Sequence, residues 1–194
     1  MDRQVDARGL PCPRPVVETK KALEELGQGV ITVLVDSIES RDNVRRFAES
    51  QGCPVEVEEK EGAFHLKVVK GEPTPSPQPE PVSGNDVVFI TTDRLGAGDE
   101  RLGEILMKAF LNTLWDYDPK PAGILFMNSG VFLTTEGSDV LDALRLLEAE
   151  GVRIVSCGTC LAYYGLTDKL QVGAAGNMYE MVDSLVAARK VIKI

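Results

Sequence analysis

The first part of the chain contains both continuous apolar runs and runs in which apolar and polar residues alternate. In the first part, Val30–Val35 is a continuous apolar and β-branched run, which predicts a buried strand. Residues 55–58 and 64–68 each alternate between apolar and polar side chains on either side of Glu61-Gly62. Two alternating runs separated by a glycine turn are typical of a β-hairpin. The first part therefore supplies at least three strands.

Two further segments of the first part have apolar residues at the spacing of a helix. They are residues 15–26 and residues 40–50, and Ser40 is the expected N-cap of the second. With a short strand over residues 4–6, the order of elements becomes βαβαββ. This order predicts a small two-layer α/β sandwich with both helices on one face of the sheet.

The second part alternates short, continuous apolar runs with longer amphipathic segments. The expected strands are 87–91, 123–127, 152–156, 170–172 and 191–194, and the expected helices are 100–114, 138–149, 161–164 and 177–188. This pattern predicts a parallel sheet that is covered on both faces. Sites in such sheets lie beyond the carboxyl ends of the strands, where the strand order reverses. We therefore expect segments 92–99, 128–137 and 157–160 to converge there.

A proline-rich stretch separates the two parts. Prolines occupy every second position from Pro73 to Pro81, and such spacing excludes helix and favours an extended, solvated spacer. We therefore expect a first domain over residues 1–70, a linker over 71–84 and a second domain over 85–194.

Composition and charge narrow the classes of partner. The formal net charge is −9, which argues against nucleic acid because phosphate binding needs clustered Lys and Arg. No apolar run reaches the roughly 20 residues of a membrane span, and the N-terminus lacks the apolar core of a signal peptide. We expect a cytoplasmic protein without a membrane partner. Its 4 cysteines are then mostly free thiols.

The first chemical signal is Cys12, which stands directly before a helix that Pro13 and Pro15 start. The free N–H groups and the positive dipole end of a helix start favour the thiolate, which is the reactive form of cysteine. The alternative reading is a small buried cysteine in a proline-rich turn.

The sequence around Cys12 adds a resemblance. The stretch DARGLPCPRPVVETKKAL, from Asp6 to Leu23, resembles the signature of the TusA (SirA-like) family of sulfur carriers. The resemblance covers about the first 70 residues. It implies a two-layer α/β sandwich that carries persulfide sulfur on Cys12.

The second chemical signal is the pair Cys157 and Cys160, which ends a predicted strand and opens a helix, as in thioredoxin-like motifs. This placement favours an exposed thiolate and allows the other thiol to resolve a sulfenate, disulfide or persulfide. A zinc site would need a second close cysteine pair or a histidine cluster, and the chain offers neither. We expect no metal and no organic cofactor. Two inert, buried cysteines are the alternative.

The second part as a whole resembles the DsrE-like family, through Thr92–Asp99 and Cys160–Leu166. This resemblance implies a flavodoxin-like sheet, homo-oligomers formed through this domain, and a persulfide-bearing cysteine at position 160. Both parts in one chain, with Asn177-Met178-Tyr179, resemble the YedF family of two-domain proteins, which is linked to selenium metabolism.

Several neighbours of the thiols are candidates for binding the transferred atom. Gly96 and Gly98 match the first two glycines of a dinucleotide-binding fingerprint, but Arg101 stands where the third would be. We therefore interpret this segment as a flexible loop and not as a dinucleotide site. Asn128 and Gly130 could offer N–H groups to a persulfide anion, or form a plain turn. The candidate binding residues are Pro13, Arg14, Gly96, Gly98, Asn128, Gly130, Gly158 and Thr159. The remaining cysteine, Cys53, and the tyrosines 163 and 164 are expected to pack.

These features favour a sulfurtransferase-like relay. Cys12 accepts sulfur or selenium as a persulfide or perselenide from a donor protein, and Cys160, with Cys157 as resolving thiol, receives it for an acceptor protein. One alternative is a thiol–disulfide oxidoreductase that uses Cys157 and Cys160. Another is a non-catalytic adaptor that binds sulfur or selenium enzymes.

Overall fold

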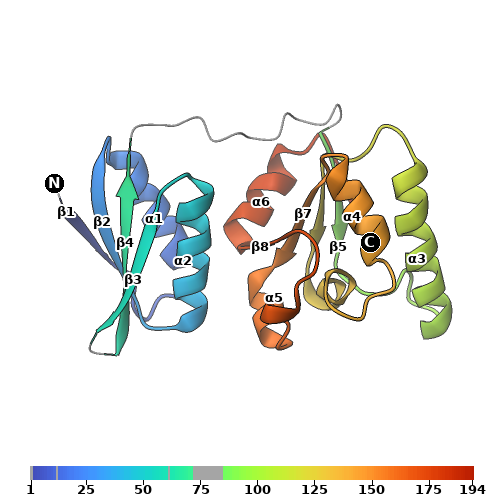
Figure 1. The fold of residues 1–194 in the computed structure, drawn as a ribbon, viewed down its shortest axis with the longest axis horizontal. Coiled ribbons are helices and arrows are strands. Elements are labelled where there is room, and N and C mark those ends of the chain that lie inside the picture. The colour runs from blue at the N-terminus through green and yellow to red at the C-terminus, as the bar shows by residue number, and fades with distance from the viewer. Residues whose placement is uncertain (1, 12, 61, 72–84) are drawn as a thin grey trace. The chain divides into compact units, whose positions relative to one another are not determined.

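The structure is a computed structural model that describes residues 2–11, 13–60, 62–71 and 85–194. The chain divides into two compact units, and each unit is built on its own β-sheet (Figure 1). Cys12 and residues 72–84 of the expected spacer lie outside the described residues. Within the described ranges, no helix combines the length and the hydrophobicity that crossing a bilayer requires.

The first unit has the expected βαβαββ order. Its elements are β1 (Asp2–Asp6), α1 (Arg14–Glu25), β2 (Gly29–Val35), α2 (Ile38–Ser50), β3 (Val55–Lys60) and β4 (Ala63–Lys70). The sheet order is β1-β2-β4-β3, in which β1 runs parallel to β2 and the other pairs are antiparallel. Both helices cover one face of this sheet (Figure 1). The predicted two-layer sandwich is therefore confirmed.

The core of the first unit follows from the apolar pattern. Ile31, Val33 and Val35 alternate along β2 and are fully buried, and they pack against apolar residues of α1 and α2 such as Leu23 and Phe47. Burial of a side chain of this size contributes about 1.5–3 kcal/mol.

The N-cap of α2 is Ser37 and not Ser40. The Ser37 hydroxyl accepts a hydrogen bond from the backbone N–H of Ser40 at 3.1 Å, so the helix begins one turn earlier than expected. Ser40 is buried inside the first turn. Both serines fit the N-cap preference, and only the position at which β2 ends decides between them.

The second unit has five parallel strands in the order β8-β7-β6-β5-β9. The strands are β5 (Asp86–Ile90), β6 (Gly123–Phe126), β7 (Arg153–Cys157), β8 (Ala174–Gly176) and β9 (Lys190–Lys193). The helices are α3 (Glu100–Asp116), α4 (Leu141–Ala149), α5 (Gly158–Tyr163) and α6 (Met178–Ala187), with short 3-10 helices η1 (Asn128–Thr134) and η2 (Thr167–Lys169). An all-parallel sheet with helices between its strands is flavodoxin-like, as expected.

Helices cover both faces of the second sheet. Neighbouring residues of β5 show this, because side chains of adjacent strand residues point to opposite faces. Val88 packs in one cluster with Met107 of α3 and Leu144 of α4. Val87 packs in another cluster with Met181 of α6. The continuous apolar strands of the sequence therefore reflect burial on both sides.

The expected strand at 170–172 is wrong. Leu170 forms only an isolated antiparallel bridge with Thr135, and the strand that pairs with β7 is β8, four residues further along. β8 consists of two alanines and a glycine. These small residues produce no apolar run, so the hydrophobic pattern could not locate the strand. The 3-10 helix η1 was likewise expected only as a loop.

Candidate functional site

Three loops meet at the carboxyl ends of the strands of the second unit. The Ser129 hydroxyl donates to the Asp93 carboxylate at 2.9 Å, which links the loop after β5 to the loop after β6. The backbone N–H of Asn128 donates to Sγ of Cys160 at 3.2 Å, which links the loop after β6 to α5. The expected convergence of the three segments is therefore present.

The meeting point is not where the strand order reverses. That reversal lies between β5 and β9, because β9 pairs with the side of β5 away from β6. Cys157 ends β7, and Cys160 follows it on α5. The cysteine pair therefore lies next to β6 and not at the switch point that general experience with α/β sheets favours.

The two cysteines of the pair have different environments. Cys157 is 1% exposed, and Cys160 is only partly buried. Burial raises the pKa of Cys157 to about 12, and N–H groups of Cys160 and Thr159 oppose this rise only in part. Cys157 is thus a neutral thiol at pH 7. Since the thiolate is the attacking form, Cys160 is the better placed of the two to react with an external molecule.

The raised pKa of Cys157 predicts a loss of stability at alkaline pH. A thiol that ionises near 9.0 in the unfolded chain and near 12 in the fold stabilises the fold below pH 9, and this contribution is lost as pH rises towards 12. We expect Cys157→Ala to have a flatter profile of unfolding free energy than wild type, by about 1 kcal/mol between pH 8 and pH 10. Urea unfolding at each pH measures this difference. Parallel profiles for the two proteins would contradict the buried-thiol assignment.

Two of the expected binding glycines are packed into the fold. Gly130 and Gly158 are both buried. A Cβ added to Gly130 would lie 2.7 Å from the backbone oxygen of Ile90, so glycine there allows η1 to approach β5 closely. The N–H of Gly130 donates to the Met127 carbonyl at 3.0 Å, which agrees with the plain-turn alternative at this position.

The other expected glycines and Thr159 lie nearer the surface. Gly96 and Gly98 are exposed, and an added Cβ at either would meet no atom within 4 Å. They form the loop between β5 and α3, as expected. Thr159 is partly buried and occupies the second position of α5, next to Cys160.

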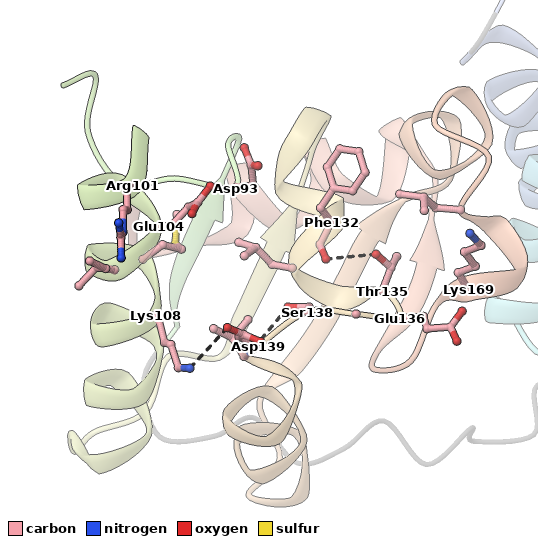
Figure 2. A pocket seen from close by; sticks show the side chains of 16 residues that line it. Asp93, Arg101, Glu104, Lys108, Phe132, Thr135, Glu136, Ser138, Asp139 and Lys169 are labelled. Atoms are coloured by element: carbon pink, nitrogen blue, oxygen red, sulfur yellow. Dashed lines mark hydrogen bonds and ion pairs between the residues drawn. The ribbon is translucent and has the colours of Figure 1, made fainter. Parts of the chain in front are cut away.

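A pocket of about 620 Å³ adjoins this meeting point (Figure 2). Asp93 and Phe132 line it, and both also contact the surroundings of Cys160: Asp93 through Ser129, and Phe132 through the ring of Tyr164 at 4.8 Å between centroids. Its charged lining is mixed and comprises Asp93, Arg101, Glu104, Lys108, Glu136, Asp139 and Lys169. Cys160 is not among the lining residues. The Cys160 thiol therefore lies near this pocket but does not line it.

The residues that flank Cys12 form an anchored turn. The backbone N–H of Gly9 donates to the Asp36 carboxylate at 2.7 Å, and the N–H of Arg14 donates to the Pro11 carbonyl at 2.9 Å. Pro13 is the N-cap of α1, and the exposed Arg14 is its first residue. The expected helix start next to the motif is therefore present, although Cys12 itself lies outside the described residues.

The beginning of the same loop is held by an ion pair. Arg8 donates two hydrogen bonds to the Asp6 carboxylate, at 2.9 and 2.6 Å. These bonds lower the pKa of Asp6 to about 2. The pair stays charged across the range in which thiol chemistry operates, so the loop before Cys12 keeps this anchor.

The remaining cysteine has a structural environment. Cys53 is 5% exposed and packs in the core of the first unit. Burial raises the pKa of its thiol, which disfavours the reactive form. Within the described ranges, no group of three or more His, Cys, Asp or Glu side chains is arranged to hold a metal ion.

Comparison with known proteins concerns mainly the first part of the chain. Residues 3–70 match the family model described as sulfurtransferase TusA. A Methanocaldococcus jannaschii protein assigned as a sulfur carrier is 41% identical over 70 residues, which are 35% of this chain and 93% of that protein. The sulfur carrier protein TusA of Allochromatium vinosum is 34% identical over 71 residues, which are 36% of this chain and 93% of the relative.

One solved structure is also similar to part of the chain. The crystal structure of a SirA-like protein from Desulfitobacterium hafniense is 45% identical, with a TM-score of 0.35. The match covers 37% of this chain and 100% of that one. The similarity to these relatives thus takes in nearly all of their length and about a third of the present chain.

Proposed function

Because this chain belongs, through residues 3–70, to the TusA family of sulfurtransferases, we propose that it is a sulfur carrier whose loaded residue is Cys12. The observation that carries the proposal is the family match across the Cys-Pro-x-Pro motif. The hydrogen bonds of Gly9 and Arg14 and the start of α1 next to position 12 support the proposal. The chemistry requires a donor protein with a persulfide and an acceptor thiol.

Loading is a displacement at sulfur. The Cys12 thiolate attacks the terminal sulfur of the donor persulfide, and a new S–S bond forms at Cys12. The S–S bond of the donor breaks, and the donor sulfur leaves as a thiolate with that electron pair. No net oxidant is consumed, since one persulfide is exchanged for another.

We assign Cys160 as the second station. Its thiolate attacks the terminal sulfur of the Cys12 persulfide, the S–S bond at Cys12 breaks, and Cys12 is released as a thiolate. Two features of the second unit support this role: Cys160 is partly accessible, and its sulfur accepts the Asn128 N–H at 3.2 Å. This N–H is a fixed donor beside the sulfur that would carry the transferred atom.

The finer assignment follows the resemblances of the second part. A DsrE-like domain fused to the carrier domain implies homo-oligomers formed through residues 85–194 and a link to selenium metabolism. A perselenide is transferred by the same displacement, because the reaction needs only a soft nucleophile and a chalcogen–chalcogen bond. We include selenium in the proposal on this chemical ground.

A second candidate function is a thiol–disulfide oxidoreductase, which the Cys-x-x-Cys spacing of Cys157 and Cys160 favours. The burial and raised pKa of Cys157 disfavour it as the thiol that attacks a substrate disulfide, so such an enzyme would attack with Cys160 and use Cys157 as the resolving thiol. The oxidoreductase requires Cys157, whereas the sulfur carrier can load Cys160 without it.

The experiment that separates them uses three single variants, Cys157→Ser, Cys160→Ser and, as a control, Cys53→Ser. Each protein is incubated with inorganic polysulfide, and peptide mass spectrometry measures persulfide at position 160. The carrier role predicts wild-type loading in Cys157→Ser and Cys53→Ser and none at position 160 in Cys160→Ser. Persulfide on Cys160 that accumulates in Cys157→Ser but not in the wild type, together with disulfide reductase activity of the wild type, would support the oxidoreductase instead, because a resolving Cys157 displaces the outer sulfur as sulfide and forms a disulfide with Cys160.

A further inference from the structure

The backbone at Asn128 has an unusual conformation. Its φ is 50°, and it is the single non-glycine residue with positive φ in the described part of the chain. A residue with a Cβ atom loses roughly 1 kcal/mol or more in this left-handed region, although asparagine tolerates it better than most. Such a conformation persists only where surrounding contacts hold it.

The left-handed turn has a chemical consequence. It lies two residues after the end of β6, and the Asn128 N–H points at the Cys160 sulfur, at 3.2 Å. The donor is a backbone group, so no substitution of the Asn128 side chain removes it directly. Its direction depends on φ of Asn128 and on ψ of Met127, which together orient that peptide plane.

The side chain of Tyr164 binds the side chain of Asn128, the residue that forms this turn. Its hydroxyl donates to Oδ1 of Asn128 at 2.9 Å. Tyr164 follows α5 directly, and its own N–H donates to the Cys160 carbonyl at 3.1 Å, so it lies one helical turn after the thiol. Its ring is partly buried and packs against Phe132 of η1 at 4.8 Å between centroids. The tyrosine therefore joins α5 to the turn at two points.

These contacts close a ring. From the Cys160 sulfur it passes through the Asn128 N–H, the Asn128 side chain and the Tyr164 hydroxyl, and it returns along one turn of α5. We propose that Tyr164 is a positioning residue for Cys160: its hydroxyl holds Asn128 in the left-handed conformation that directs the N–H to the sulfur. The proposal rests on the proposed function only in taking Cys160 as the reacting thiol. The sequence alone suggested packing for Tyr164, since a hydroxyl at this position gives no signal of its partner.

The test measures alkylation of Cys160 by iodoacetamide in the full chain, with peptide mass spectrometry as readout. Tyr164→Phe keeps the ring and removes the hydroxyl. We expect its alkylation rate at pH 7 to fall by about threefold to tenfold, because a charge-assisted hydrogen bond to the thiolate is weakened. Tyr163→Phe is the matched control, because Tyr163 is 84% exposed and its loss of hydroxyl leaves the rate unchanged.

A second background separates positioning from general damage. Glycine adopts positive φ without penalty, so Asn128→Gly keeps the turn without needing the tyrosine. We expect the addition of Tyr164→Phe to Asn128→Gly to leave the alkylation rate of that variant unchanged, whatever that rate is, because the glycine no longer offers the hydroxyl a side-chain partner. The proposal would be overturned if Cys160 in Tyr164→Phe were alkylated at the wild-type rate. It would also be overturned if Tyr164→Phe lowered the rate equally in the wild-type and the Asn128→Gly backgrounds. Alkylation needs no sulfur donor, so failure of the sulfur-carrier function would leave this result unaffected.

Discussion

Cys12→Ser is expected to lose sulfur loading from a protein-bound persulfide by at least about a hundredfold, because a serine hydroxyl without an adjacent base does not attack sulfur. The loss should extend to Cys160 in the same chain, since the proposed route from a protein donor passes through position 12. Labelled sulfur from the donor, measured on the peptides that contain Cys12 and Cys160, gives both quantities in one experiment.

The matched control for this variant is Cys53→Ser. Cys53 lies in the same unit and is 5% exposed, so its replacement should leave loading unchanged. If the Cys12→Ser chain still received sulfur on Cys160 from the protein donor at the wild-type rate, Cys12 would not be the entry point. The two domains would then load separately.

Gly173→Ala is expected to cause the largest loss of stability of any single methyl addition considered for the second unit. Gly173 has φ of 74°, and an added Cβ would lie 2.5 Å from both the backbone oxygen and the Cγ2 atom of Ile154. A contact this short with backbone forces a shift of β7, which ends at Cys157 and precedes α5. We expect a loss of about 3 kcal/mol or more, the range of severe overpacking with backbone strain.

Urea unfolding followed by the fluorescence of Trp115, the single tryptophan, measures this loss in the second unit. Gly137→Ala is the control, because Gly137 has φ of 90° but would meet no atom within 4 Å. Its expected loss is about 1 kcal/mol, from the backbone conformation alone. Equal losses in the two variants would show that the close approach to Ile154 has no energetic effect.

The parts of the fold that sequence could predict are those with a strong apolar period. Val30–Val35 and the strands β5 to β7 consist mostly of apolar residues, so their residue types alone predict that they are buried. The meeting of the three loops at the carboxyl ends of these strands follows from a parallel sheet. β8 escaped prediction because Ala174, Ala175 and Gly176 pack by being small.

The sequence predicted which cysteines form the candidate site, but it did not predict the residues that position them. The Cys157–Cys160 spacing identified the strand–helix junction, and Asn128 was correctly expected near it. The different roles of the two cysteines depend on which one ends β7 inside the sheet, which spacing does not reveal. The Tyr164–Asn128 hydrogen bond joins residues 36 positions apart and depends on a left-handed turn that only the folded backbone shows.

The measurement that tests the account most directly follows sulfur between the two thiols. The wild-type chain is loaded with labelled sulfur from a protein-bound persulfide, the donor is removed at once, and peptides are analysed over time, with Cys160→Ser as the control. The account predicts that label leaves the Cys12 peptide as an equal amount appears on the Cys160 peptide, and that it stays on Cys12 in the control. Label that remains on Cys12 in the wild type as long as in Cys160→Ser would contradict the relay.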